Sequence, residues 1–320
     1  MNCKVIHNFL WRVAIITLSA QLIFISCSRE KIKFTPSRDS LMIARLHLKQ
    51  TNSTLFVTIP RNVRIKEYFK FIDSLVKVEG DLLNQNLSEY LIVHANPWLL
   101  DSLRNSDYYI QKKRGFFQYD QREKIILQRG DRLVMPDSDL IASINNKLRS
   151  TILDVNIPEY KLRIIQRDDT ILTCHVRIGQ SATKYLELAG REVNLQTPVG
   201  KGEIIRIERN PYYLNPVDGT HYDSTLRDDG RYTKMPIIPW LEPSINGIRY
   251  GTLIHATTNA STLGKAFSHG CVGTSESDAW SIYYNSPLGT KVIFRYDLKI
   301  KTKKGDTLML KDIYRLSDVE

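Results

Sequence analysis

The sequence predicts an α+β protein in which a mainly β domain follows a smaller α/β domain. In the first part of the chain, the alternating run Thr54–Ile59 precedes an apolar stripe at helical spacing over Arg64–Val78. In the second part, short alternating runs separated by turns predominate, beginning with Tyr160–Gln166 and Ile171–Ile178. A chain of 320 residues with 42% hydrophobic residues is long enough for two modest domains that each bury a core.

The first 27 residues have the pattern of a secretory signal. The start is basic, and the mostly apolar run Val13–Ile25 is too short to cross a bilayer comfortably. The run ends in Ser26-Cys27, which resembles a bacterial lipobox, where the signal is removed and the cysteine is lipidated. An ordinary signal peptide that happens to contain a cysteine is the alternative.

We therefore expect residues 1–27 to be a lipoprotein signal peptide, Cys27 to be lipidated, and residues 28–53 to be a tether. This predicts a protein of the bacterial cell envelope, periplasmic and held on a membrane by its lipid anchor. The pattern does not distinguish the inner membrane from the outer one.

Residues 54–150 are predicted to form the N-terminal α/β domain. Its expected strands are Thr54–Ile59, Leu91–Val93 and Lys124–Leu127, and its expected helices are Arg64–Val78, Trp98–Leu103 after Pro97, and Asp137–Leu148. The last of these has Asp137 or Ser138 as its cap and Leu140, Ile141, Ile144 and Leu148 facing inward. The run Arg129–Pro136 is faintly similar to the end of a LysM wall-binding module; a plain turn between strands is the alternative.

The second domain is predicted to be mainly β. Expected strands are Tyr160–Gln166 and Ile171–Ile178 as a hairpin, Leu186–Leu188, Glu203–Ile207, a run ending at Ile254, and Lys291–Tyr296, with a short helix over Asp278–Tyr284. The polar segment Leu214–Met235 is expected to be a long loop of the kind that often forms a lid. Residues 299–320 are expected to be a C-terminal tail.

One stretch carries the chemistry: Ser268-His269-Gly270-Cys271, with His255 sixteen positions before the cysteine. A thiol is a good nucleophile only as the thiolate, and a nearby imidazole is the usual base that generates it. His255 ends an apolar run that predicts a strand, so it would sit on a rigid element beside a cysteine on a loop. Gly270 would permit the sharp turn that such a loop needs.

This stretch resembles the signature of the L,D-transpeptidase catalytic domain (YkuD family), an upstream His followed by Ser/Thr-His-Gly-Cys. Thr197–Gly200 and Asn210–Tyr213 are similar to the family's upstream motifs, and Gly289–Val292 is similar to a downstream one. The likeness covers roughly Ile157–Tyr296. It implies a YkuD-like β-sandwich or barrel as the catalytic domain, over residues 157–298, and a transferase of peptidoglycan biosynthesis with a part in cell wall organisation and cell shape.

The resemblance also implies roles. Cys271 would be the nucleophile that forms a thioester with a donor stem peptide, and His255 would be its base, oriented by the Ala256 carbonyl or a neighbour. The N–H groups of Gly270 and Cys271 would hold the oxyanion. His269 would shape the pocket and Ser268 would support the turn. Attack by an acceptor stem peptide would then give a 3→3 cross-link.

Two positions depart from the family pattern. Gly273 stands where Arg or Asn usually follows the cysteine by two positions, and Ala256 stands where Gly commonly follows the first histidine. The first change bears on substrate preference and on activity. It makes a catalytically weak peptidoglycan-binding lipoprotein one alternative. Two further alternatives are an L,D-carboxypeptidase that uses water at the same site and an unrelated secreted cysteine peptidase.

We expect no cofactor and no metal. A zinc site built from His255, His269 and Cys271 would leave one coordination position open, but the wider pattern favours acyl transfer. The net charge of +11 favours anionic surroundings, yet no basic block is interleaved with aromatic residues, so nucleic acid is not expected as a partner. Cys174 alternates with apolar residues, which favours a buried thiol over a disulfide with Cys271.

Overall fold

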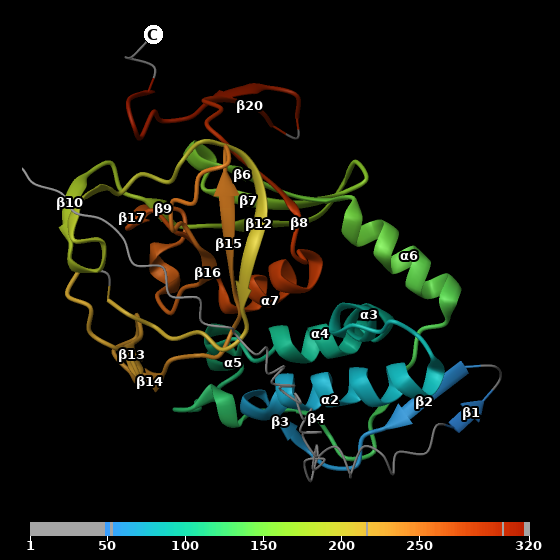
Figure 1. The fold of residues 1–320 in the computed structure, drawn as a ribbon. Helices are drawn as coiled ribbons and strands as arrows, with labels where there is room; N and C mark the ends of the chain where they lie inside the picture. Colours follow the sequence, from blue (N-terminus) through green and yellow to red (C-terminus); the bar gives the residue numbers. More distant parts are fainter. Residues whose placement is uncertain (1–48, 52–53, 216, 303, 317–320) are drawn as a thin grey trace, which may run out of the picture. The chain divides into compact units, whose positions relative to one another are not determined.

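The computed structural model describes residues 49–51, 54–215, 217–302 and 304–316 (Figure 1). The predicted signal peptide and Cys27 lie outside these residues, and so does most of the predicted tether. No helix in the described part of the chain combines the length and the apolar character that crossing a membrane requires.

An eight-stranded sheet forms the framework of the second half of the chain. Its spatial order is β18 (Val272–Thr274), β16 (Ile254–Ala256), β15 (Trp240–Ile245), β12 (Gly200–Glu208), β19 (Lys291–Arg295), β6 (Thr151–Asn156), β7 (Lys161–Gln166) and β8 (Asp169–His175). The pairs β16–β18 and β19–β6 are parallel, and the other neighbours are antiparallel. β12 and β15 cross the centre of the view in Figure 1.

The two ends of this sheet meet at one point. Arg177 lies just after β8, and Gly273 lies in β18 at the other end of the strand order. The two residues form an antiparallel bridge, with N–H···O distances of 2.8 and 2.9 Å. Next to it, β9 (Ile178–Gly179) pairs with β17 (Ala266–Ser268). The sheet is therefore nearly closed, which confirms the predicted α+β class with a β-sandwich or barrel.

The bridge corrects one predicted strand. Alternation predicted a continuous strand over Ile171–Ile178, but β8 ends at His175. Beyond that point the chain leaves β7, and Arg177 takes Gly273 as its partner instead. The apolar pattern continues through Ile178 because both segments face the same core, so periodicity alone could not show the change of partner.

Helix α7 (Glu276–Asn285) lies between the large sheet and the N-terminal helices (Figure 1). It is buried on nearly all sides, and Trp280, Tyr283 and Tyr284 pack as an aromatic cluster. The hydroxyl of Tyr284 is 2.6 Å from that of Tyr68 in α2 (Ile65–Leu83), which pairs two polar groups inside the core. One continuous hydrophobic core thus joins both parts of the chain. The division into domains at residues 54–150 and 157–298 stays a prediction.

The N-terminal part is mainly helical. Its helices are α2 (Ile65–Leu83), α3 (Glu89–Ala95), α4 (Pro97–Arg104), α5 (Tyr108–Lys113), η1 (Gln121–Glu123) and α6 (Ser138–Arg149). Its strands are β1 (Lys49–Thr51), β2 (Thr54–Thr58), β3 (Val63–Arg64), β4 (Ile125–Leu127) and β5 (Arg132–Val134). The predicted helices at Arg64, Trp98 and Asp137 are confirmed, and so is Asp137 as a cap, since its side chain accepts a hydrogen bond from the Leu140 N–H.

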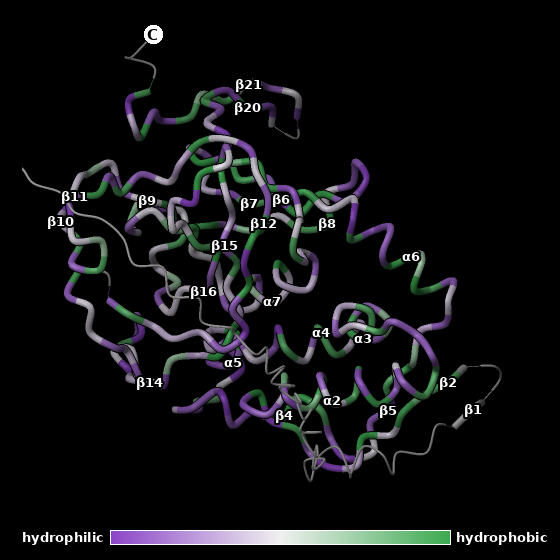
Figure 2. Tube along the Cα trace, viewed as in Figure 1, coloured by the Kyte–Doolittle hydropathy of each residue, from purple (hydrophilic) through white to green (hydrophobic). Residues whose placement is uncertain are grey.

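The predicted strand Leu91–Val93 is wrong, because these residues lie in α3. The Ser88 side chain caps this helix by accepting a hydrogen bond from the Leu91 N–H at 3.3 Å. Packing against neighbouring helices overrides the strand propensity of the Ile-Val pair. Leu140, predicted to face inward on α6, is exposed, whereas Ile144 and Leu148 are buried. Hydrophobic and hydrophilic residues alternate along α6 in Figure 2.

The segment Leu214–Met235 is more ordered than a loop. It contains a hairpin of β13 (Ser224–Leu226) and β14 (Tyr232–Lys234), closed by a turn at Gly230. The predicted tail also contains a hairpin, of β20 (Lys299–Lys301) and β21 (Thr307–Met309). The remaining elements are η2 (Ile157–Glu159), β10 (Thr183–Leu186), η3 (Glu187–Ala189), β11 (Arg191–Asn194) and η4 (Ala260–Thr262).

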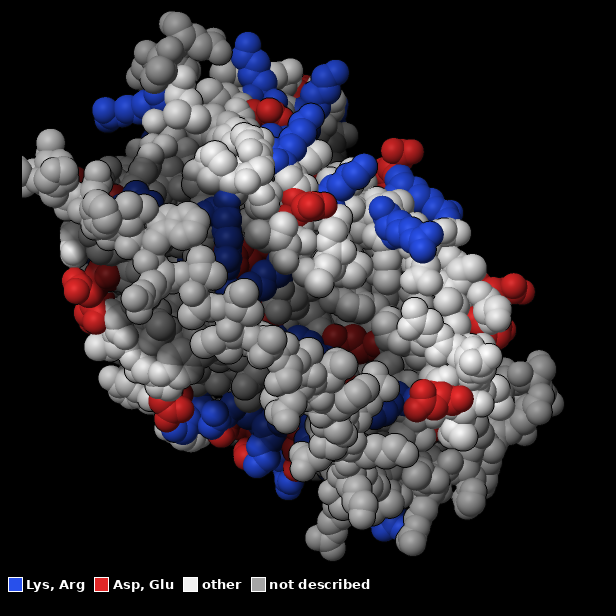
Figure 3. Space-filling view, viewed as in Figure 1, with Lys and Arg blue, Asp and Glu red and all other residues white. Residues whose placement is uncertain are grey.

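Surface charge is dispersed on the face that Figure 3 shows. Lys and Arg side chains are scattered there among Asp and Glu side chains rather than gathered in one block. This is the arrangement that the sequence predicts for a basic surface without a dedicated patch.

Candidate functional site

The sheet register brings the two main candidate residues to one face. β16 and β18 are parallel neighbours, and His255 is opposite Gly273. Opposite residues on paired strands point to the same side, as do residues two apart along one strand. Cys271 is two positions before Gly273, immediately ahead of β18. Its side chain therefore shares a face with that of His255, although sixteen positions of chain separate them.

A tight turn presents the thiol. Gly270 has φ 109°, a left-handed conformation that side chains rarely adopt. The Ser268 hydroxyl donates to the Cys271 carbonyl at 2.6 Å and accepts from the Gly270 N–H at 3.3 Å. Ser268 is buried, so these contacts fix the turn from inside. The positions of Ser268 and Gly270 in the turn agree with the roles that the resemblance implies.

A second layer of hydrogen bonds holds the turn from behind. Thr197 donates to the Gly270 carbonyl at 3.1 Å and accepts from the Gly179 N–H at 2.9 Å. Tyr314 donates to the Gly179 carbonyl at 2.7 Å and accepts from the Thr197 N–H at 3.1 Å. Thr197 belongs to the Thr-Pro-x-Gly segment that the sequence singled out. Tyr314 lies in the predicted tail, and no pattern in the sequence pointed to it.

His255 is prepared to act as a neutral base. Its Nδ1 lies 2.7 Å from the Ala256 carbonyl oxygen, which can only accept, so Nδ1 carries the proton and Nε2 keeps a free lone pair. Burial and the charge of Arg177 lower the pKa of His255 to about 4, against the opposing effect of the Ala256 carbonyl. The imidazole is therefore uncharged at neutral pH. The carbonyl of Ala256 is the contact that the resemblance implied.

Cys271 is half-buried and is a free thiol. Burial raises its pKa above the ordinary value, while the Leu253 N–H and the charge of Arg177 act in the opposite direction. The Leu253 N–H donates to the sulfur at 3.4 Å. Because the thiol keeps its proton and the imidazole is neutral, the two groups do not form a preformed ion pair.

Arg177 is a site residue that the sequence did not reveal. A Cβ added at Gly273 would lie 2.6 Å from its Nε and 2.7 Å from its Cγ. The arginine side chain therefore covers the backbone at Gly273, the position at which the chain departs from the family pattern. No sequence signal could have placed it there, since the contact depends on the closure of the sheet.

The other predicted residues are placed as follows. His269 is partly buried, and burial together with Lys184 and Arg177 lowers its pKa. The Cys271 N–H has no acceptor among the described residues and is available as a donor, whereas the Gly270 N–H already faces Ser268. Cys174 is buried and free, as predicted, and burial raises its pKa. Within the described ranges, no group of three or more His, Cys, Asp or Glu side chains is arranged to hold a metal ion.

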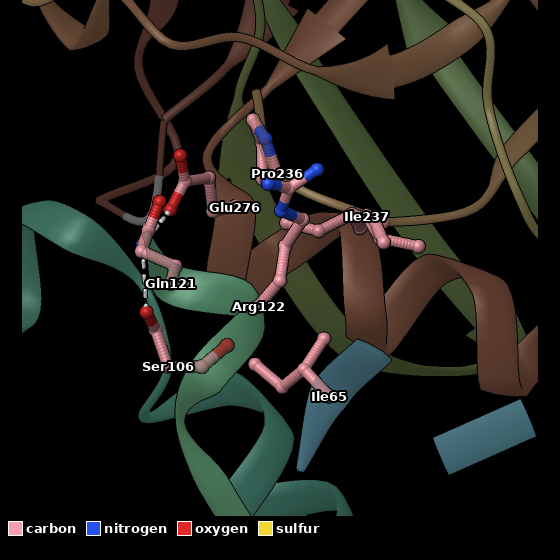
Figure 4. Close-up of a pocket in the computed structure, with 8 residues that line it drawn as sticks. Ile65, Ser106, Gln121, Arg122, Pro236, Ile237 and Glu276 are labelled. Atoms are coloured by element: carbon pink, nitrogen blue, oxygen red, sulfur yellow. Dashed lines mark hydrogen bonds between the residues drawn. The ribbon is translucent and has the colours of Figure 1, made fainter. Parts of the chain in front are cut away.

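A buried polar cluster lies elsewhere, beside a small pocket that neither Cys271 nor His255 lines (Figure 4). The Gln121 side chain donates to the Ser106 carbonyl at 2.8 Å and to Glu276 at 2.9 Å. Glu276 also accepts from Arg227, which comes from the hairpin β13–β14. This cluster connects the N-terminal helices, the hairpin and α7, so it organises the structure around the site without forming part of it.

The family comparison agrees with the motif. Residues 150–294 match the family model described as the L,D-transpeptidase catalytic domain (YkuD). No curated protein matches the sequence.

Solved structures give distant matches. An L,D-transpeptidase from Xylanimonas cellulosilytica is 14% identical, with 64% of this chain and 92% of that chain covered and a TM-score of 0.34. One from Mycobacterium smegmatis is 14% identical, with 46% and 58% covered and a TM-score of 0.32. One from Enterococcus faecium is 16% identical, with 46% and 50% covered and a TM-score of 0.31. The chain thus spans about half the length of the last two.

The family match covers the whole Ser-His-Gly-Cys turn, His255, and every strand of the large sheet apart from one residue of β19. Residues 150–294 are therefore similar to the L,D-transpeptidase catalytic domain family.

Proposed function

We propose that the protein is a peptidoglycan L,D-transpeptidase that works through a cysteine thioester. The observation that carries the proposal is the pairing of β16 with β18, which brings a half-buried thiol and a neutral, oriented imidazole to one face. A thiol with an adjacent base is the arrangement that nucleophilic acyl transfer requires. The family match supplies the substrate class, because this family acts on peptidoglycan stem peptides.

The first half of the reaction is acylation. His255 Nε2 takes the Cys271 proton as the sulfur attacks the carbonyl of the third residue of a stem tetrapeptide. A C–S bond forms, and the carbonyl oxygen becomes an oxyanion that the Cys271 N–H stabilises, since it has no other acceptor within the described residues. The imidazolium then protonates the amine of the terminal D-alanine, the C–N bond breaks, and a thioester remains.

The second half is deacylation by an amine. His255 removes a proton from the amino group on the third residue of an acceptor stem, and this nitrogen attacks the thioester carbonyl. The C–S bond breaks, the new amide is a 3→3 cross-link, and the thiol regains its proton. Water in place of the amine would give a trimmed tripeptide, the product of an L,D-carboxypeptidase.

A product assay tests this proposal. The full chain is incubated with a disaccharide tetrapeptide donor, with and without an amine acceptor, and the products are separated by chromatography and identified by mass spectrometry. A cross-linked dimer that depends on Cys271 supports transpeptidation. A tripeptide whose yield the acceptor does not change identifies a hydrolase instead, and cleavage of ordinary L,L-peptides identifies an unrelated peptidase.

The cellular location is part of the same proposal. The pattern that ends at Cys27 supports lipidation and an envelope site, where the stem peptides are found. Labelling of the full chain with a radioactive fatty acid tests it. Label incorporation that survives Cys27→Ala would rule this cysteine out. A wall-binding role for residues 54–150 is tested by sedimentation of the Cys271→Ala variant with purified sacculi.

A further inference from the structure

Arg177 is partly buried, and its Nε has no hydrogen-bond partner among the described residues. Its side chain makes no hydrogen bond and no ion pair with any described residue, and its Nε is fully buried. Burial lowers its pKa, so the charge is held at a cost. A charged group kept inside a protein is ordinarily paired. An anion that forms near Arg177 for only part of the time would supply the partner that its buried Nε lacks.

The fold places Arg177 opposite Gly273, which is close in the chain to the Cys271 thiol. Arg177 and Gly273 are joined by two backbone hydrogen bonds at the point where the sheet closes. Gly273 is two positions after Cys271, and its lack of a side chain leaves the space that the Arg177 stem occupies. A side chain at position 273 would collide with Arg177 where the arginine now lies, so the glycine leaves the arginine its place.

A nearby carboxylate and the two histidines of the motif do not stabilise a negative charge on the Cys271 sulfur. Among the described residues, Glu242 in β15 is the carboxylate whose charge raises the pKa of Cys271 and so disfavours the thiolate. Arg249 and Arg206 pair with Glu242, with nearest distances of 2.5 and 3.7 Å, and so reduce its effect. His255 is neutral at pH 7. His269 has its own pKa lowered, so it does not bring a positive charge at that pH either.

We infer that Arg177 is the counter-ion of the Cys271 thiolate, a positioning residue that favours loss of the thiol proton by placing an unpaired guanidinium over Gly273. When the proton leaves for His255 or for solvent, the negative sulfur becomes the partner that Arg177 lacks in the resting state. The inference rests on the proposed function only in taking Cys271 to be the reactive thiol. It concerns ionisation, which can be measured without any stem peptide.

The test is the pH dependence of alkylation. The full chain reacts with iodoacetamide from pH 6 to 11, and mass spectrometry quantifies the modified peptide that contains Cys271, apart from those of Cys3, Cys27 and Cys174. In this reaction the thiolate forms an S–C bond and iodide leaves. Arg177→Met keeps the aliphatic stem over Gly273 and removes the charge. We expect it to shift the midpoint upward by about one pH unit, so alkylation below the midpoint slows about tenfold.

Arg177→Lys is the matched control, since it keeps a positive charge, and its midpoint should stay close to that of the wild type. Arg177→Gln provides a second neutral side chain if the Met variant does not fold. The inference is overturned if the neutral variants have the wild-type midpoint, or if Lys shifts it as far as Met does. A shifted midpoint together with no cross-linked product would sustain this inference and reject the transpeptidase proposal.

Discussion

Arg227 Nη1 lies 2.5 Å from Glu276 Oε1, and both side chains are inaccessible to solvent, at 0% and 1% exposure. The rest of the guanidinium is also satisfied: Nε donates to Thr233, Nη2 donates to Gln121, and its plane stacks on Tyr108. Glu276 begins α7, and Arg227 follows β13. The pair therefore attaches the hairpin β13–β14 to the helix on which the large sheet packs.

Removing one partner of this pair should destabilise the protein strongly. Arg227→Met leaves the Glu276 carboxylate buried without its cation, which typically costs about 3–5 kcal/mol. Denaturation by urea, followed by circular dichroism, measures the change in the free energy of unfolding. The double variant Arg227→Met with Glu276→Gln should recover part of the loss. A single variant as stable as the wild type would show that the pair does not hold the hairpin.

The pH dependence of acylation should reflect the low pKa of His255. Because that pKa is lowered to about 4, the imidazole remains a base well below pH 6.5 and loses this function only as the pH falls through about 4. The raised pKa of Cys271 places the alkaline limit above the usual value for a thiol. We expect kcat/KM for a tetrapeptide donor to be flat from about pH 5 to about pH 9. An acidic limb near pH 6.5 would contradict this.

Thr197 should matter through its hydroxyl. Thr197→Val has nearly the same shape but leaves the buried Gly179 N–H and Gly270 carbonyl without a partner. We expect a loss of about 1–3 kcal/mol in the free energy of unfolding, and slower acylation because the turn loosens. Thr197→Ser keeps both hydrogen bonds and serves as the control. If Val and Ser behaved alike in both measurements, the hydroxyl would have no such role.

Gly270 should tolerate no side chain, for reasons of backbone conformation rather than space. Its φ of 109° is strained for any other residue, although a Cβ there would meet no atom closer than 3.6 Å. Gly270→Ala should therefore lower both the melting temperature and the acylation rate. Gly289→Ala is the matched control, with φ 81° and open space around it. It should cost stability alone; equal acylation rates in the two variants would contradict the account.

Local patterns were enough to predict much of the fold. The amphipathic stripe of α2, the Asp137 cap of α6 and the turn between β7 and β8 depend on neighbouring residues, so the sequence contains the information. Leu91–Val93 shows the limit, because the short apolar run suits a strand or a helix and only its packing decides. The long segment around Gly230 was predicted as a loop because its polar composition conceals a short hairpin.

The residues of the candidate site also fall into two groups: those that a local pattern indicates and those whose contacts depend on the fold. Cys271, His255, Ser268 and Gly270 could be singled out because they lie in one short motif, and the pairing of β16 with β18 places the two ends of that motif at neighbouring strands. Arg177 and Tyr314 were missed because their contacts arise where distant segments meet, at the closing bridge of the sheet and at the turn near Thr197. The sequence showed that Gly273 departs from the family pattern. It could not show that the Arg177 side chain covers Gly273.

The proposed role of His255 as the base can be tested by its effect on the acylation rate. His255→Ala removes the base and should slow acylation by a factor of about 100 or more, while leaving the thiol in place. Stopped-flow measurement of carbapenem acylation gives the rate. His269→Ala, which changes a histidine that the mechanism does not use as the base, should have a smaller effect. A His255 variant that acylates at the wild-type rate would remove this residue from the mechanism.

The most direct measurement is the mass of the acylated protein. The full chain is mixed with a tetrapeptide donor, quenched in acid within seconds, and digested for peptide mapping. The account predicts a mass increase equal to the mass of the donor minus the mass of the released D-alanine. This increase should be located on Cys271 and absent from Cys271→Ser. The same adduct in equal yield on the Ser variant, or one located on another residue, would contradict it.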